Sequence, residues 1–115
     1  MESDEIICKA CQPDAAKVQP SELTQFLIEN KSWNLKNETE IEKLEKKYVF
    51  SNFVQAKKFV NIVGDLAEKE GHHPSILLEY GSATINWWSH KIEGIHAKDL
   101  TLAQKTDQLF REFMK

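Results

Sequence analysis

The sequence predicts an α+β fold: a four-stranded antiparallel sheet with three helices packed on one face, in the order α-β-β-α-β-β-α. Apolar residues recur with helical spacing in three stretches, and a pair of alternating segments follows each of the first two. Hairpins grouped with helices favour an antiparallel sheet over a parallel one. At 115 residues the chain has the length of a single domain with one core.

The first helix is expected to follow a polar arm. Residues 1–20 form this N-terminal arm, and residues 21–115 form the single folded domain. Pro20 interrupts regular structure at the end of the arm. Ser21 is a preferred N-cap residue, and the apolar residues after it continue a short helix to about Asn30.

The first pair of strands carries a weaker signal. Trp33 and Leu35 alternate with polar residues, which predicts a short strand, and a turn is expected at Asn37–Glu38. The segment 41–50 admits two interpretations, because some of its apolar residues also have helical spacing. Alternation near its end and the preceding strand favour a second strand, and therefore a hairpin.

The central helix has the strongest signal. Residues 52–70 carry a broad apolar stripe, and Gly71 is a natural helix stop. The stripe consists of Phe53, Ala56, Phe59, Val60, Val63, Leu66 and Ala67. Two strands are expected next, at 75–80 and 83–90, with a turn at Gly81–Ser82.

The last predicted strand has two different faces. One face holds Ala83, Ile85 and Trp87, and the other holds Thr84, Asn86, Trp88 and His90. The apolar face is expected to pack on helices, and the mixed face to line an open surface or a cavity. A final helix is expected to start near Ala97.

Composition excludes several classes of protein. With 15 basic and 18 acidic side chains the net charge is −3, which argues against a nucleic-acid-binding surface. No apolar run approaches the roughly 20 residues of a membrane-spanning helix. The acidic N-terminus lacks the features of a signal peptide. We therefore expect a cytoplasmic protein with no membrane or nucleic-acid partner.

The two cysteines, Cys8 and Cys11, have C-x-x-C spacing in the polar arm. A redox motif would follow a strand and open a helix, and a structural zinc site needs about four ligands. Neither context is present in the sequence. Reduced thiols are the favoured interpretation, with a disulfide or a partial metal site as alternatives.

Three of the four histidines belong to one constellation. Glu68 is followed by the adjacent pair His72 and His73, then Pro74, and His90 lies further along the chain. Histidine has an unperturbed pKa of about 6.5, so it can give or take a proton near neutral pH. Pro74 disfavours helical backbone at His73, and a helix–strand junction can aim side chains into a cavity.

Other interpretations of these histidines exist. An isolated pair is usually a surface or structural feature, and three histidines can also hold a catalytic zinc ion. Adjacent residues in extended backbone point in opposite directions, however, and the helical His-x-x-x-His spacing is absent. Metal-free acid–base chemistry without a cofactor is therefore favoured.

Residues near the constellation have structural alternatives too. His96 and Asp99 have the spacing of a capping box at the start of the last helix. Glu68 is either a solvated helix carboxylate or a group that orients a histidine. Trp87 and Trp88 face opposite ways, so one is expected in the core and the other can provide a flat wall.

The stretch from Phe50 to Ala103 resembles the pterin-4a-carbinolamine dehydratase family, which is also described as a dimerisation cofactor of a homeodomain transcription factor. The likeness covers nearly all of the chain after residue 20. It rests on Glu68, His72-His73-Pro74, Tyr80, Ser89-His90, Gly94, Asp99 and Leu102-Ala103.

The chain departs from the family pattern near the second motif. Lys91 replaces the usual acid after His90, and Glu93-Gly94-Ile95-His96 stands where Gly-Gly-Leu-Thr is usual. Ser75 replaces a common acidic residue after the proline. These departures bear on substrate preference and rate more than on reaction class, because all three histidines are present.

The resemblance implies dehydration of 4a-hydroxytetrahydropterin to quinonoid dihydropterin. This step recycles the cofactor of aromatic amino acid hydroxylases, notably phenylalanine hydroxylase. It also implies a homodimer or homotetramer. The alternatives are a protein-binding module that stabilises dimers of a transcription factor, and a pterin-binding protein without turnover.

For the implied reaction we expect His72 and His90 to be the proton-transfer pair and His73 to bind and orient the pterin. Glu68 and Asp99 are expected to orient the histidines. Alternation places Trp88 on the strand face of His90, where it can form a flat wall against the pterin ring. Pro74 and Ser89 are expected to complete the site.

Overall fold

The computed structural model of the protein describes residues 15–115. Its elements follow the predicted order, with one short 3₁₀ helix added before the last α-helix. Within the described residues no helix is both long and apolar enough to span a membrane. The elements are α1 (Pro20–Glu29), β2 (Asn34–Glu38), β3 (Ile41–Val49), α2 (Phe53–Glu70), β4 (Ser75–Glu79), β5 (Ser82–Trp87), the 3₁₀ helix η2 (His90–Ile92) and α3 (Ala97–Phe113).

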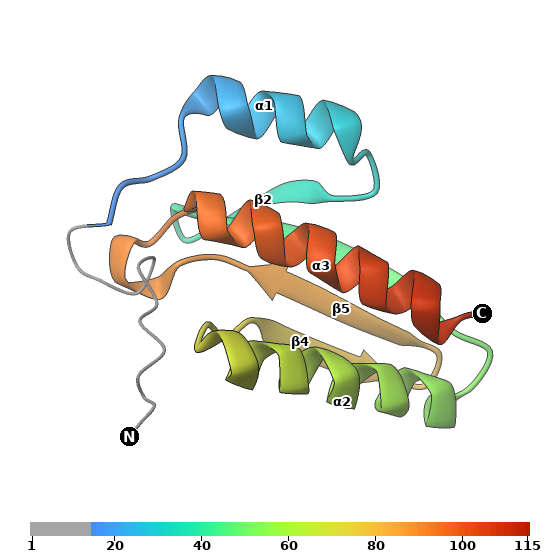
Figure 1. Cartoon of the computed structure of the whole chain (residues 1–115). Helices are drawn as coiled ribbons and strands as arrows, with labels where there is room; N and C mark the ends of the chain where they lie inside the picture. Colours follow the sequence, from blue (N-terminus) through green and yellow to red (C-terminus); the bar gives the residue numbers. More distant parts are fainter. Residues whose placement is uncertain (1–14) are drawn as a thin grey trace.

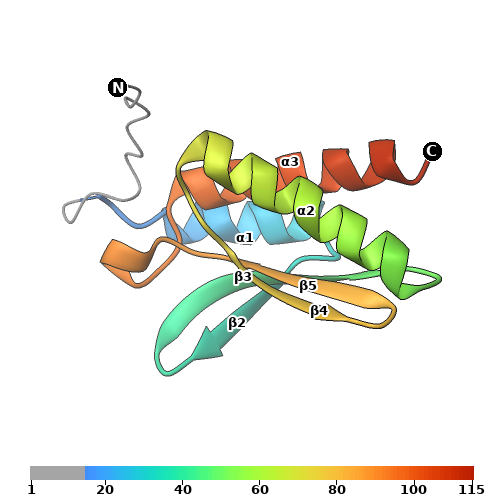
Figure 2. The same cartoon turned by 90° about the horizontal axis from the view of Figure 1, so that it is seen from below.

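The four strands form one antiparallel sheet in the order β2-β3-β5-β4. All three α-helices lie on the same face of this sheet (Figure 1), which is clearest when the sheet is seen below the helices (Figure 2). The predicted fold class is therefore confirmed. The central strand β5 pairs on both sides, with Leu44 opposite Trp87 and Ile76 opposite Ile85.

The core fills the space between the sheet and the helices. Ala83, Ile85 and Trp87 of β5 are fully buried, as their alternation predicts. Helix α2 adds a buried stripe that consists of Ala56, Phe59, Val63 and Ala67. Phe53, expected in that stripe, is 42% exposed, so the buried part begins one turn later. Trp33 is buried but precedes β2.

Helix α1 begins two residues earlier than expected. Its N-cap is Gln19 rather than Ser21, and Pro20 lies in its first turn. Proline is compatible with this position because its missing N–H would have no helical partner there. The helix ends at Glu29, with Asn30 as its C-cap.

Both hairpin turns lie at other residues than predicted. The first is at Thr39–Glu40, whose φ angles are 49° and 65°, because Asn37–Glu38 still pairs with β3. Two successive left-handed residues match the twist of a two-residue hairpin. The second turn is at Tyr80–Gly81, since Ser82 already pairs with Glu79.

Strand β5 ends at Trp87, three residues before His90. Ser89 makes only an isolated bridge to Gly94, and His90 opens η2. The chain leaves the sheet where the Ser89 hydroxyl donates to Asp99 of α3. The prediction that His90 continues the alternation of the strand is therefore wrong.

Candidate active site

The histidine pair lies where α2 turns into β4. Gly71 ends α2 in the left-handed conformation, with φ 63°, which glycine adopts without a side-chain clash. His72 and His73 follow, and Pro74 leads directly into β4 at Ser75. The turn directs His72 into the interior, where it is 2% exposed, whereas His73 is exposed.

A buried carboxylate holds His72. The Nε2 atom of His72 lies 2.7 Å from Oδ1 of Asp99, which is completely buried in the first turn of α3. The other oxygen of Asp99 accepts from the Ser89 hydroxyl at 2.7 Å and from the backbone N–H of His96 at 2.9 Å. Buried carboxylates need such donors because an unpaired buried charge is strongly unfavourable. Asp99 therefore links the histidine pair, the end of the last strand and α3.

The fourth histidine, His96, has the structural role that its spacing predicted. Its Nδ1 accepts the N–H of Lys98 at 3.0 Å, while Asp99 accepts the N–H of His96. Together these bonds make a reciprocal capping box at the start of α3. Asp99 thus serves the helix end and His72 with the same side chain.

His90 is carried by a short closed loop. Ser89 and Gly94 bridge its two ends, with the N–H of Ser89 donating to the carbonyl of Gly94 at 2.7 Å. Between them Glu93 adopts a left-handed backbone with φ 51°. A Cβ at Gly94 would lie 2.9 Å from Cε of Lys17, so this position needs glycine or a shift of the lysine. The ends of the loop are fixed while most of its interior is exposed.

Two adjacent tryptophans each stack on one histidine. Trp87, buried at the end of β5, lies nearly parallel to His72, with ring centroids 5.9 Å apart. Trp88, on the other face of the sheet, stacks on His90 with centroids 4.3 Å apart and planes 5° apart. The Nζ atom of Lys43 lies 4.1 Å from the centroid of the Trp88 ring. The end of the last strand therefore supports both histidines.

The exposed histidines have their own polar partners. Nε2 of His90 lies 3.1 Å from the carbonyl oxygen of His73, and since a carbonyl only accepts, this nitrogen carries the hydrogen. Nε2 of His73 lies 2.5 Å from a carboxylate oxygen of Glu68, one turn back on α2. The side chains of His73 and Glu68 are both more than half exposed, so water weakens the attraction between them.

The three histidines meet around one hollow. It has a volume of about 170 Å³, and its lining consists of His72, His73, His90 and Lys91. The other predicted site residues do not line it. Glu68, Asp99 and Trp88 each contact one of the histidines, Ser89 donates to Asp99, and Pro74 adjoins His73 in the chain.

The sequence family described as pterin 4 alpha carbinolamine dehydratase matches residues 16–109. The chain belongs to this family. The match contains every residue that lines the hollow and every residue that supports it.

Relatives in the pterin-4-alpha-carbinolamine dehydratase family match most of the chain. A protein of Nitrosococcus oceani named "Putative pterin-4-alpha-carbinolamine dehydratase" is 44% identical over 90% of this chain and 92% of its own length. A protein of Marinobacter nauticus with the same name is 48% identical over 90% of this chain and 93% of its own length.

Solved structures share the fold. A structure described as a transcriptional coactivator/pterin dehydratase from Brucella melitensis has a TM-score of 0.72 and 22% identity, and covers 82% of this chain and 98% of its own. A pterin dehydratase-like protein described as a RuBisCO assembly factor in the alpha-carboxysome has a TM-score of 0.57 and 22% identity, and covers 68% of this chain and 88% of its own. At these identities the likeness concerns the fold.

Two contacts of this pterin dehydratase family member were not foreseen from sequence. Trp87 was expected only as a core residue and not as the stacking partner of His72. The cation–π contact of Lys43 with the Trp88 ring was not expected at all. The pairing of Leu44 with Trp87 places Lys43 and Trp88 next to each other on one sheet face. This contact can be predicted only when the register of β3 and β5 is known, and the sequence did not determine that register.

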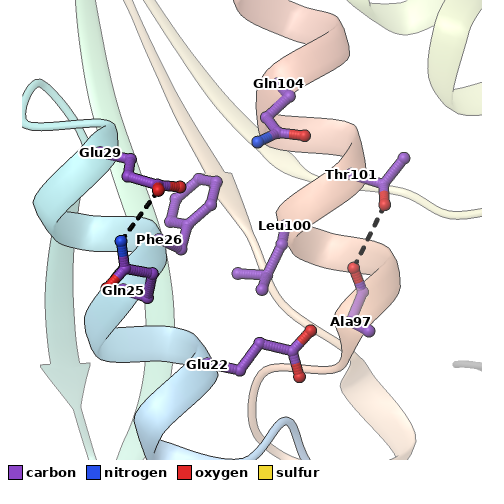
Figure 3. Close-up of a pocket in the computed structure, with 8 residues that line it drawn as sticks. All are labelled: Glu22, Gln25, Phe26, Glu29, Ala97, Leu100, Thr101 and Gln104. Atoms are coloured by element: carbon purple, nitrogen blue, oxygen red, sulfur yellow. Dashed lines mark hydrogen bonds between the residues drawn. The ribbon is translucent and has the colours of Figure 1, made fainter.

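A wider groove elsewhere has different chemistry. It lies between α1 and α3, has a volume of about 390 Å³, and contains no histidine (Figure 3). Phe26 and Leu100 provide its apolar surface, and Glu22 and Glu29 provide carboxylates. The larger volume of this groove does not make it the reactive site, because it lacks the histidine side chains on which acid–base chemistry near neutral pH most often depends.

The sequence expectations on metals concern two places. Cys8 and Cys11 lie outside the residues that the structure describes. Within residues 15–115, no three histidine, cysteine or acidic side chains are placed to hold a metal ion together. In the hollow, the Nε2 atoms of His72 and His90 instead contact a carboxylate and a carbonyl.

Proposed function

We propose that this chain dehydrates 4a-hydroxytetrahydropterins to quinonoid dihydropterins by histidine acid–base catalysis. The product is the form from which the cofactor of aromatic amino acid hydroxylases is regenerated. The observation that carries the proposal is the hollow lined by His72, His73 and His90. Membership of the pterin dehydratase family supports the substrate class.

The reaction needs two proton transfers and no electron donor or acceptor. The C4a–O bond breaks, its electron pair leaves with the oxygen, and that oxygen takes up a proton to become water. The adjacent ring nitrogen N5 loses its proton, and the electron pair of that N–H bond forms the C4a=N5 double bond. Each positioned acid or base typically contributes about 10²–10⁴-fold to the rate.

His72 and His90 are our candidates for the two transfers, and His73 for binding the pterin. In neutral His90 the Nε2–H donates to the carbonyl of His73, so Nδ1 carries the lone pair and accepts the proton. His72 is oriented by Asp99 in a buried, low-dielectric environment, where a hydrogen bond to a carboxylate is strong.

The supporting residues act through the histidines in this proposal. Asp99 orients His72, Ser89 anchors the loop of His90, and Glu68 orients His73. Trp88 does not line the hollow, so we replace its expected role as a wall for the pterin with the positioning of His90.

The test is the rate at which a 4a-hydroxytetrahydropterin disappears, measured against its uncatalysed decay. We expect His72→Ala and His90→Ala each to lower kcat by about 10²–10⁴-fold with an unchanged circular dichroism spectrum. His96→Ser is the matched control, because it removes the fourth histidine and keeps a good helix cap.

Two outcomes contradict the proposal. Unchanged turnover in the double variant of His72 and His90 would remove these residues from the mechanism. Decay at the uncatalysed rate in the wild-type protein would favour one of the other interpretations, a protein-binding module or a pterin-binding protein without turnover. Equilibrium binding of a pterin then separates these two.

A further inference from the structure

One residue of the hollow has no role in the proposed function. Lys91 lines the hollow together with the three histidines, and its ammonium group is charged at neutral pH. No carboxylate is among the lining residues. The electrostatic environment that a ligand meets there is therefore positive or neutral, and not negative.

The two carboxylates that contact the histidines of the hollow are engaged by them and by other donors, and Glu93 on the loop of Lys91 does not line the hollow. Glu68 contacts His73, and Asp99 is completely buried with donors from three residues. Within residues 15–115, Lys91 forms no ion pair. Lys43, by contrast, pairs with Glu38 at 2.9 Å. The cation at the hollow is thus available to a negatively charged ligand.

The loop that carries Lys91 keeps this charge next to His90 in the hollow. Lys91 follows His90 directly, and the bridge between Ser89 and Gly94 fixes both ends of the loop. If His90 accepts the proton of N5 or protonates the oxygen on C4a, the ring carbon C6 lies close to His90, because C6 is bonded to N5. A substituent on C6 then lies within the range of a flexible lysine side chain.

We infer that the site prefers pterins whose C6 side chain carries a negative charge, such as a phosphate or a carboxylate, and that Lys91 determines this preference. The inference rests on the proposed function for the placement of the pterin ring. An ammonium group favours an anionic oxygen through a charge-assisted hydrogen bond. A neutral side chain offers no such partner.

Equilibrium binding tests the inference without turnover. The probes are 6-hydroxymethylpterin and its monophosphate, which are stable and differ by one anionic phosphate group, and their intrinsic fluorescence reports binding. We expect wild-type protein to bind the phosphate ester about two- to fivefold more tightly, the range of a solvent-exposed ion pair. Lys91→Met should abolish the difference and Lys91→Glu should reverse it.

Two controls show whether the effect belongs to this position. Lys57→Met removes an exposed lysine from the opposite end of α2 and should leave the preference unchanged. Raising the salt concentration should reduce the preference, because exposed charges are screened. Inorganic phosphate should compete with the ester only weakly, since it lacks the ring.

The inference and the proposed function fail separately. Equal affinity of wild-type protein for both probes, or a preference that survives in Lys91→Met, would overturn the role of Lys91 even if dehydration is fast. Absence of dehydration with a charge preference that depends on Lys91 would overturn the proposed catalysis alone. With both intact, kcat/KM for the corresponding 4a-hydroxy compounds should show the same order as the affinities.

Discussion

The two sides of the hollow are built in different ways. On the inner side, His72 is buried, hydrogen-bonded to the buried Asp99 and stacked on the buried Trp87. On the outer side, His90 is exposed, stacked on the half-buried Trp88 and bonded to a backbone carbonyl. Both tryptophans come from the end of the same strand, one from each face of the sheet.

This difference gives the hollow one rigid side and one side that is accessible to solvent. Electrostatic interactions are stronger in the low-dielectric interior, so the inner side combines a defined orientation with a large contribution to stability. The outer side is held by a ring stack and a solvent-exposed hydrogen bond, each of modest strength. We therefore expect changes on the inner side to affect folding and activity together, and changes on the outer side to affect mainly activity.

The tryptophan pair should show the largest contrast. Trp87→Ala removes a completely buried ring and its hydrogen bond to Thr106, and should lower the free energy of unfolding by about 4 kcal/mol. Trp88→Ala should lower it by about 1 kcal/mol. Denaturant unfolding checks both values. Equal losses of unfolding free energy would show that the inner and outer sides of the hollow do not differ in their contribution to stability.

Trp88 should instead affect turnover. We expect Trp88→Ala to reduce kcat/KM by about tenfold, because His90 loses the plane that positions it. Trp88→Phe keeps an aromatic plane and should recover most of the activity. If the phenylalanine variant is as slow as the alanine variant, stacking is not what positions His90.

The variants of Asp99 and Glu68 should show the next largest contrast in stability. Asp99→Ala leaves the buried donors of His72 and Ser89 without their acceptor and should lower the free energy of unfolding by about 3 kcal/mol. Glu68→Ala removes an exposed partner of His73 and should lower it by less than about 0.5 kcal/mol. Urea unfolding of both variants measures the contrast. A large loss in the Glu68 variant would contradict the distinction between the two sides.

Ser89 lies between the two sides and should give an intermediate effect. Ser89→Ala removes one donor to Asp99 and frees the end of the loop of His90, and should lower the free energy of unfolding by about 1.5 kcal/mol. Turnover should fall more than in Ser75→Ala, which changes an exposed serine at the start of β4. Equal turnover in the two variants would show that the loop does not depend on this bond.

The smallest effect concerns pH and the link between α2 and α3. Hydrogen bonds from Lys98 and Lys105 lower the pKa of Glu70 below its usual 4.5. Ionised Glu70 therefore stabilises the fold above about pH 4.5, and this contribution is lost as the pH falls. Glu70→Gln should lower the free energy of unfolding by about 0.5 kcal/mol at pH 7.

Acid unfolding checks this prediction. The difference between wild type and Glu70→Gln should shrink as the pH falls from 7 to 3, because the carboxylate of Glu70 becomes increasingly protonated. Glu22→Gln is the control, because this residue lies on the exposed side of α1. A difference that stays constant from pH 7 to pH 3 would show that the charge of Glu70 is not its cause.

The sequence predicted the features that depend on periodicity and on local backbone chemistry. The stripe of α2 and the stop at Gly71 are local, so the junction that carries His72 was placed correctly. The first turn was displaced because Thr39 and Glu40 adopt left-handed backbone without a glycine to mark them.

Features that depend on tertiary contacts were less accessible. Alternation extended the last strand to His90, but the bond from Ser89 to Asp99 draws the chain out of the sheet before that residue. Trp88 was still associated with His90, although through a loop stack rather than a strand face. The partner of Trp88 on β3 depends on the strand register and was missed.

The bridge between Ser89 and Gly94 makes the segment between them an exchangeable module. Its ends are held by the sheet, by α3 and by the chain before α1, so its middle can vary without disturbing the core. Position 91 can then acquire a new charge by a single substitution at little risk to folding. Such an arrangement allows ligand preference to evolve quickly on an unchanged scaffold.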